Sequence, residues 1–374
     1  MKKYFIFFAI AWVIFISHAI YTRHAIYGDG NGYYSYTQAL FFDKSLNFSP
    51  IYNFLGHFQG RTGEFSRLFW DTGKNNPFPI GTGIVWLPSM ALMSIFSDDR
   101  FSLIYELGPG LTGIVFMLAG LFLIEKYLSE RFSKNVVFWT ILTLFFGSNI
   151  FYYTAFEPAL SHQPAFLIVA ILIYLTSGKK KFSLVLIGLL SGLLVSIRNA
   201  DVILLIPILY AIKERRTEWI QYALGFLVGI APQIANQAVQ YQGVLNNPYL
   251  TGMDGTWQVN PAHTLEFLIS PKRGLFMWTP VFLLATYGLI KQKRVLILIT
   301  LFIVVAVSSS WSAYLSAGFG QRFMFSAIPF FAPGIAYIYS KVNQTKVWKY
   351  FGFFSIYNAL LLAGFYLLGW KNLP

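Results

Sequence analysis

Residues 103–134, LIYELGPGLTGIVFMLAGLFLIEKYLSERFSK, join a long apolar run to a cluster of basic residues. The apolar part, residues 103–125, is long enough for a helix to cross a bilayer, because about 20 helical residues span the roughly 30 Å hydrocarbon core. Lys126, Arg131 and Lys134 come next, and short loops on the cytoplasmic side of a membrane accumulate such residues. The segment therefore predicts a spanning helix that ends in the cytoplasm.

The composition extends this prediction to the whole chain. Its 374 residues are 56% hydrophobic and only 11% charged, with a mean hydropathy of +0.56, whereas soluble proteins carry about 25% charged residues. Apolar runs continue through residues 1–374 without a long polar block, so we expect a single integral membrane domain and no separate soluble domain. The absence of Cys excludes disulfides, thiolate metal sites and a Cys nucleophile. The first run, after Lys2 and Lys3, lacks a signal-peptide cleavage site and is expected to remain as the first helix.

Eleven apolar runs are predicted to span the membrane, so the predicted fold class is an all-α polytopic membrane protein. They lie near residues 4–22, 103–125, 135–153, 162–177, 182–199, 201–213, 219–240, 275–290, 295–311, 323–341 and 350–370. A further run, residues 80–96, contains Pro88 and is followed by Asp98, Asp99 and Arg100; if it also crosses, the count becomes 12.

The distribution of charge decides the placement of residues 80–96. If this run does not cross, all the basic clusters fall on one side of the membrane. The clusters are Lys2/Lys3, Lys126/Arg131/Lys134, Lys179/Lys180/Lys181, Lys213/Arg215/Arg216, Lys291/Lys293/Arg294 and Lys341/Lys346/Lys349. They hold 17 of the 28 basic residues beside four acidic residues, Glu125, Glu130, Glu214 and Glu218, and this excess of 17 over 4 equals the net charge of +13. We therefore expect residues 80–96 to form a juxtamembrane or re-entrant helix, with the N-terminus in the cytoplasm and the C-terminus outside.

This topology describes an integral protein of the cell (inner, cytoplasmic) membrane with its functional residues on the outer face. The pI of 9.6 then reflects topology, and nucleic acid is not an expected partner. The longest outer segments are a first loop of about residues 23–102 and a second loop of about residues 241–274. The first loop carries aromatic residues at helical spacing, which predicts a juxtamembrane helix in the headgroup region with its aromatic side chains buried.

Asp29 is the candidate catalytic residue. It lies in Tyr27-Gly28-Asp29-Gly30-Asn31-Gly32, directly after the first predicted span, where a substrate can approach the carboxylate closely and the carboxylate can act as a general base. Alternatively, Asp29 or Asn31 caps the helix that follows. A calcium loop is excluded, because its sixth and twelfth positions would be Tyr34 and Leu40 rather than Gly and Glu.

Glu157 and His162 lie between two predicted spans on the same outer face. Their side chains could hold a divalent cation or share a proton with an acceptor, but two residues at this spacing are a weak metal signal. Polar capping of two helix ends is the alternative.

Four basic residues on the outer side are candidates to bind a phosphate group. Arg198 follows a long apolar run and needs a partner, for which Asp201 and a lipid phosphate are the candidates. Lys272 and Arg273, in SPKRGLFMWTP (270–280), and Arg322, in GFGQR (318–322), lie where two spans begin. Arg offers paired donors for phosphate, although each of these residues could also simply reach lipid headgroups.

The outer segments also contain Trp257, Trp278 and Trp311, on any of which a sugar ring could stack. The motifs of soluble nucleotide-binding enzymes and hydrolases do not occur: we find no Walker loop, GxGxxG after a strand, HExxH or GxSxG.

Together these segments resemble the GT-C superfamily of polytopic glycosyltransferases, within it the branch of protein O-mannosyltransferases and the aminoarabinose transferase of lipid A. The resemblance rests on Gly28-Asp29-Gly30, the aromatic helix that ends at residues 42–48, Glu157 and His162 at the second acidic motif, and the segments 270–280 and 318–322. Asp29 lacks the adjacent Glu found in O-mannosyltransferases, and the C-terminal soluble domain of several members is not expected here.

The resemblance implies transfer of a monosaccharide from a polyprenyl-phosphate-linked donor to a hydroxyl of a lipid, glycan or protein acceptor, with inversion and on the outer face. Asp29 is then the general base, and Lys272, Arg273, Arg322 and Arg198 bind the donor phosphate. No cofactor is certain, and a divalent cation is possible. The donor, the acceptor and membrane lipids are the expected partners.

Two other classes of function stay open at this point. A transporter or flippase of lipid-linked saccharides would also need phosphate-binding Arg residues, but it should require access from both faces. A membrane acyltransferase would have only His162 or His18 as its intramembrane His.

Overall fold

The computed structural model of the protein describes residues 2–58, 75–178, 180–243, 246, 256–315 and 318–369. Within these residues the regular structure is helical, apart from an isolated β-bridge between Trp257 and Trp311. The helices are, in chain order, α1 (Lys2–Thr22), α2 (Asp29–Gln38), η1 (Ala39–Asp43), α3 (Ser49–Phe58), α5 (Gly81–Met93), α6 (Leu103–Ser129), α7 (Lys134–Phe146), α8 (Ile150–Ala155), α9 (His162–Ser177), α10 (Leu184–Ile197), η3 (Asn199–Leu205), α11 (Ile206–Ala211), η4 (Arg216–Glu218), α12 (Trp219–Tyr241), α14 (Pro261–Ile269), α15 (Leu275–Trp278), α16 (Val281–Lys291), α17 (Val295–Ser309), η5 (Arg322–Ala327), α18 (Ile328–Lys341) and α19 (Val347–Leu367). The predicted all-α class is confirmed for the part of the chain that the structure describes.

Four of the described helical segments are long and apolar enough to cross a membrane. They are Lys2–Thr22, Leu103–Ser129, Arg322–Lys341 and Val347–Leu367. Large apolar side chains remain exposed along the outside of the bundle, including Phe5 (75%) and Leu367 (82%), as expected for a surface that faces lipid. These features fit a membrane-embedded protein.

The predicted number of eleven spanning helices is not supported, because several of the runs form helices that are shorter than a spanning helix and others are interrupted. Residues 135–153 divide into α7 and α8 around Gly147, residues 201–213 divide into η3 and α11 before Pro207, and residues 275–290 divide into α15 and α16 before Pro280. Proline lacks an amide N–H and glycine weakens a helix, so both interrupt the hydrogen bonds that an apolar run would otherwise form. Such breaks are tolerated at membrane depth where other helices surround them.

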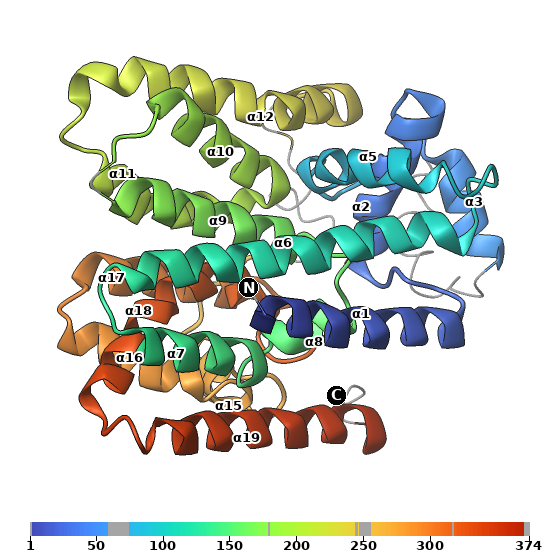
Figure 1. Ribbon diagram of the computed structural model, residues 1–374. Coiled ribbons are helices and arrows are strands. Elements are labelled where there is room, and N and C mark those ends of the chain that lie inside the picture. Colours follow the sequence, from blue (N-terminus) through green and yellow to red (C-terminus); the bar gives the residue numbers. More distant parts are fainter. Residues whose placement is uncertain are drawn as a thin grey trace.

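The helices lie side by side, so most connections gather at two ends of the bundle (Figure 1). The α6–α7, α9–α10, α11–α12, α16–α17 and α18–α19 connections lie together at the left in Figure 1; we call this the basic end, because these connections carry the predicted basic clusters. Lys179 of these clusters lies outside the described residues. Helices α2, α3 and α5 lie toward the opposite end, which we call the site end.

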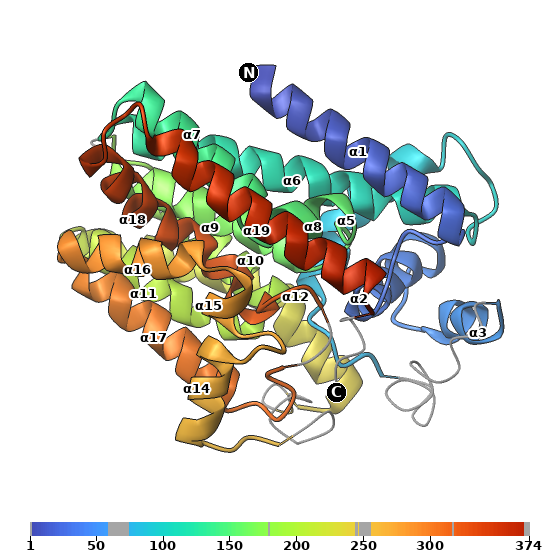
Figure 2. The same cartoon turned by 90° about the horizontal axis from the view of Figure 1, so that it is seen from below.

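Helix α1 runs antiparallel to α6. Lys3, at the start of α1, forms an ion pair with Glu125 near the end of α6 (2.9 Å), while Phe15 packs over Gly110 near the start of α6. Helix α19 lies beside α7 and is at the front in Figure 2, which shows the molecule from below. Asn358 of α19 donates a hydrogen bond to the carbonyl of Phe146 (2.9 Å). The N-terminus therefore begins beside the end of α6, as the charge distribution predicted.

Close contacts between small residues join the two helices that lead toward the site. Gly188 and Gly192 of α10 face Gly225 and Gly229 of α12, and a Cβ at any of them would lie 2.1–2.2 Å from a backbone oxygen of the facing helix. Small residues at four-residue spacing allow helix backbones to approach closely in membranes. These contacts hold α10 against α12, and the chain turns at Arg198, directly after α10.

Helix α2, in the predicted first outer loop, is more deeply buried than the sequence predicted. Helix α2 is not a surface helix with one aromatic face, because its residues from Gly30 to Gln38 are all buried. It packs between α5 and α12, where Tyr36 lies against Gly83 and its hydroxyl accepts hydrogen bonds from Asn236 and Gln240. Helix α5 has 13 residues, about 20 Å at 1.5 Å per residue. Helix α10, within a predicted span, has a similar length of 14 residues, so the placement of residues 80–96 as a juxtamembrane or re-entrant helix stays a prediction.

Candidate functional site

Asp29 is the first residue of α2 and does not act as its cap. The N-cap position is Gly28, with φ 49°, and no side chain caps the helix. A Cβ at Gly30 would lie 2.4 Å from the carbonyl oxygen of Ala159, so this position admits only glycine without a shift of the backbone. The two glycines thus allow the turn into α2 and its close approach to the 156–161 segment. The alternative interpretation, helix capping by Asp29 or Asn31, is wrong.

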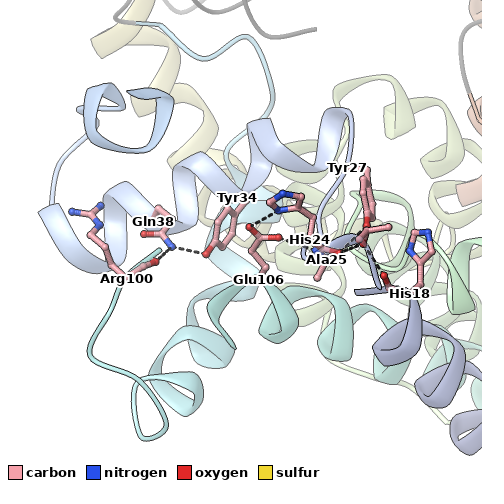
Figure 3. Close-up of polar contacts among 9 residues, drawn as sticks. His18, His24, Ala25, Tyr27, Tyr34, Gln38, Arg100 and Glu106 are labelled. Atoms are coloured by element: carbon pink, nitrogen blue, oxygen red, sulfur yellow. Dashed lines mark hydrogen bonds and ion pairs between the residues drawn. The ribbon is translucent and has the colours of Figure 1, made fainter. Parts of the chain in front are cut away.

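The segment before Asp29 is held by a buried carboxylate that the sequence did not single out. Glu106 of α6 is only 4% exposed and accepts a hydrogen bond from the amide of Ala25 (2.8 Å), while the ring of His24 lies 3.7 Å from its other oxygen (Figure 3). The hydroxyl of Tyr27 donates to the carbonyl of His24 (2.7 Å). These contacts tie residues 24–27 to α6 and so fix the place from which α2 begins.

The carboxylate of Asp29 forms an ion pair with Arg322. The distance between Nη1 of Arg322 and Oδ2 of Asp29 is 3.0 Å, and the two side chains are 18% and 38% exposed. Arg322 begins η5 two residues after Gly318-Phe319-Gly320, where both glycines have positive φ (132° and 66°). This turn is held in place because the amide of Phe319 donates a hydrogen bond to the hydroxyl of Tyr153 (3.2 Å). The structure therefore unites two of the predicted site residues, one from each half of the chain.

Arg273 supports the same turn from the other side. It is 5% exposed, and its Nε and Nη1 donate to the carbonyls of Gly318 (3.1 Å) and Leu315 (2.8 Å). Burial lowers the pKa of this guanidinium from its usual value, but an Arg stays charged at neutral pH. Arg273 thus positions the segment that carries Arg322. Lys272 is less buried, and its amide bonds to the hydroxyl of Ser270 (3.2 Å).

Glu157 lies within electrostatic reach of the Asp29–Arg322 pair. Burial raises the pKa of its carboxyl above the ordinary value, and the nearby Asp29 carboxylate adds to this increase. A hydrogen bond from the Tyr152 hydroxyl (2.7 Å) and the charge of Arg322 lower the pKa in part. The residue lies in the turn between α8 and α9. It is a second acidic group beside the pair, as the sequence predicted.

His162 and Arg198 contact one another. Nη1 of Arg198 lies 2.8 Å from Nδ1 of His162. A guanidinium only donates hydrogen bonds, so we assign Nδ1 of His162 as the acceptor, and its lone pair is occupied. Nε of Arg198 lies 3.4 Å from Oδ2 of Asp201. Arg198 therefore has the local acidic partner that the sequence offered.

The contacts of Glu157 and His162 do not resemble a metal site. Glu157 bonds to Tyr152 and His162 bonds to Arg198. Within the described ranges no three His, Cys, Asp or Glu residues come together as possible ligands of one ion. The two residues instead belong to separate hydrogen-bonding groups around Asp29.

A cavity of about 410 Å³ opens beside Asp29. Asp29, Tyr33 and Arg198 are the titratable groups among its described lining residues, whereas the rest of the wall is mainly apolar and aromatic. The apolar lining includes Pro79, Ile197, Ala200, Val202, Ile203, Trp257, Val307, Trp311 and Phe323. The described lining includes none of Lys272, Arg273 and Arg322, but Arg322 contacts Asp29, which does line the cavity.

Two of the three predicted Trp residues line this cavity. The rings of Trp257 and Trp311 lie 4.9 Å apart, and the two residues form the β-bridge described above. Trp278 is buried elsewhere: it packs edge-on against Phe319, and its indole N–H donates to the carbonyl of Pro271 (2.8 Å). Trp278 therefore supports the turn before Arg322 and does not face the cavity.

Tyr33 is a site residue that the sequence did not assign to the chemistry. Burial, together with the nearby Asp29 carboxylate, raises the pKa of its phenol to about 12. Tyr33 follows Asp29 by four residues, and residues at this spacing lie on the same face of a helix. This spacing is the signal that could have identified it. The contribution of Tyr153, which depends on a contact with Phe319 far along the chain, had no such signal.

Comparison of the chain with protein-family models, with curated proteins and with solved structures finds no match.

Proposed function

We propose that the protein is a membrane glycosyltransferase that moves a monosaccharide from a polyprenyl-phosphate-linked donor to an acceptor hydroxyl, with inversion. The observation that carries the proposal is the mixed lining of the cavity beside Asp29, which combines two charged groups with a mainly apolar and aromatic wall. The carboxylate of Asp29 and the guanidinium of Arg198 line it, and apolar and aromatic residues form most of the remaining lining. A donor of this class has the same division, because a phosphate and a sugar are joined to a long apolar chain.

The cations suit a leaving phosphate. Arg198 lines the cavity, and Arg322 lies 3.0 Å from Asp29, one of the lining residues. Arg side chains bind phosphate oxygens through paired charge-assisted hydrogen bonds, and cations held in place before reaction stabilise charge that develops on a leaving group. Val202 is 48% exposed at the apolar wall, which suits contact with a prenyl chain. Trp257 or Trp311 then offers an aromatic face to the sugar.

Asp29 is the base in this scheme. The acceptor oxygen attacks the anomeric carbon as the bond from that carbon to the phosphate oxygen breaks, and the acceptor proton passes to Asp29. The products are the glycosylated acceptor and a polyprenyl phosphate. A single displacement inverts the anomeric carbon, as in inverting glycoside hydrolysis. The ion pair with Arg322 must open for this, and a bound donor phosphate competes with Asp29 for that guanidinium.

We further propose that the site faces the outside of the cell membrane. The basic connections lie at the opposite end of the bundle from α2, and such connections favour the cytoplasm. The interrupted pairs α7–α8, η3–α11 and α15–α16 would then each complete one crossing, which gives eleven crossings with residues 80–96 re-entrant. Tagging of the basic connections and of α3 with a membrane-impermeant reagent in intact cells tests this arrangement; labelling of the basic connections would refute it.

The function is tested with purified protein in nanodiscs and a panel of polyprenyl-phosphate monosaccharides. We expect consumption of one donor and release of polyprenyl phosphate, in amounts that an Asp29→Asn variant does not produce. Translocation of the lipid-linked sugar across liposomes without chemical change would support a transporter instead. Donor consumption that is unaffected by Asp29→Asn would remove Asp29 from the mechanism.

A further inference from the structure

A second cavity, of about 640 Å³, lies at the basic end of the bundle and is larger than the one beside Asp29. Residues of α9, α11, α17 and α18 form most of its wall, and Tyr127 from the end of α6 completes it. Its volume falls within the range of about 300–1,000 Å³ that is usual for small-molecule sites. None of the proposed catalytic residues contributes to it.

The wall of this cavity is apolar and its rim is cationic. Ile173, Ile208, Ile297 and Phe330 belong to the wall, whereas Lys293 and Arg294 line it at the start of α17. Among the described residues, neither cation has a carboxylate within ion-pair distance (4.0 Å). The described lining also contains no Asp, Glu or His. The cavity therefore offers positive charge without a group that could serve as a general base.

Two further cations lie directly behind the lining. Arg131 is stacked over the ring of Tyr127 (4.6 Å) and donates to the carbonyl of Ser177 (3.0 Å). Lys213 is stacked over the ring of Tyr210 (4.1 Å). All three of these contacted residues line the cavity. Arg131 and Lys213 have neighbouring carboxylates, Glu130 at 3.3 Å and Glu214 at 3.8 Å, so the excess charge at the rim comes from Lys293 and Arg294.

We propose that this cavity binds an anionic glycerophospholipid, with its phosphate at Lys293 and Arg294 and an acyl chain along Ile173, Ile208 and Phe330. A cation that only reaches toward bulk headgroups needs no cavity behind it. Here the cations border an apolar space that opens at the end of a membrane-embedded bundle. A phospholipid has matching parts, because its charged headgroup is joined to apolar acyl chains. This site is independent of the proposed sugar transfer.

The charge of the rim is tested with a double variant, Lys293→Gln/Arg294→Gln. The matched control is Lys346→Gln/Lys349→Gln, which removes the same charge from two exposed positions, directly before α19 and in its first turn, that do not line the cavity. Binding of phosphatidylglycerol to the detergent-purified protein is followed by native mass spectrometry. Two basic residues near an anionic lipid together raise its affinity by a factor of about 30, so we expect the double variant to weaken the phosphatidylglycerol adduct about thirtyfold, and the control to leave it unchanged.

The apolar part is tested with Ala211→Trp, which places an indole at an exposed position of the lining and keeps every charge. We expect this variant also to lose the adduct, while phosphatidylcholine binds weakly to all forms. Equal weakening by the control, an adduct that survives Ala211→Trp, or displacement of phosphatidylglycerol by millimolar inorganic phosphate would overturn the proposal. Monodisperse elution and an unchanged melting temperature in pure detergent confirm that each variant is folded.

Discussion

Replacement of Asp29 by Asn should abolish sugar transfer while the protein remains folded. At 3.0 Å the attraction between Asp29 and Arg322 is about 5 kcal/mol at an effective dielectric constant of about 20. However, the Asp29 side chain is 38% exposed, and desolvation and screening reduce the net contribution of such pairs to about 1 kcal/mol. Loss of a general base costs a factor of about 10² to 10⁴ in rate, or about 3–5 kcal/mol in the barrier. The effect on turnover should therefore exceed the effect on stability.

The assay is single-turnover donor consumption, together with thermal unfolding of the same preparation. The matched control is Asp43→Asn, because Asp43 also pairs with an Arg toward the site end of the chain. Both oxygens of Asp43 accept from Arg100 (2.8 Å each), and neither residue lines the cavity beside Asp29. We expect Asp43→Asn to lower the melting temperature at least as much as Asp29→Asn does, but to keep turnover within a few-fold of the wild-type rate.

Two results would refute this reasoning. Turnover by Asp29→Asn within about threefold of wild type would show that Asp29 is not the base. An equal loss of turnover in Asp43→Asn would show that transfer merely follows the stability of this end of the molecule. A loss confined to Asp29→Asn, with both variants folded, is the outcome that the geometry predicts.

Three further predictions follow from the contacts around the site. Glu106→Ala should lower kcat with little change in KM and reduce the free energy of unfolding by about 1–3 kcal/mol, because the Ala25 amide loses its buried acceptor. Glu106→Gln keeps an acceptor oxygen and should recover most of the kcat and most of the stability. Equal losses in the two variants would contradict the positioning role of Glu106. Burial raises the folded-state pKa of Glu157, so the folded protein holds this proton more tightly than the unfolded chain and loses stability as pH rises from about 4.3 through the raised pKa. The Glu157→Gln variant has no carboxyl to ionise at this position, so its melting temperature relative to wild type should increase between pH 4 and pH 8. A difference in melting temperature that does not change with pH would refute the burial argument. Val307→Trp should fill part of the cavity beside its apolar wall and raise KM most for donors with long prenyl chains. An increase in KM that does not depend on the length of the prenyl chain would show that this chain binds elsewhere.

The sequence predicted well those features that depend on neighbouring residues. Apolar runs identify membrane helices because hydropathy is a local property, and the recurrence of basic clusters placed their connections at one end of the bundle before any packing was known. Gly28-Asp29-Gly30 located the start of α2 because glycine tolerates the backbone conformations of a turn that other residues rarely adopt, and so marks where helices are separated. The sequence does not show where the apolar runs are interrupted, since the cost of a Pro or Gly in a buried helix depends on what surrounds it.

Other features followed only from the packing of distant segments. The sequence left helix capping as an alternative role for Asp29, and the structure removes that alternative by pairing its carboxylate with Arg322. In the sequence Glu106 is a single acidic residue within an apolar run, and its role follows only from its hydrogen bond with the amide of Ala25.

By itself, then, the sequence determined that this is a helical membrane protein, and it determined which polar residues lie at the ends of its helices, because hydropathy and charge act along the chain. Only the tertiary structure decided which of those residues share a cavity. It joined Asp29 to Arg322 and Arg198 to His162, and it assigned Arg273 to hold a turn, because ion pairs and hydrogen bonds depend on distances of about 3 Å that no spacing in the sequence specifies.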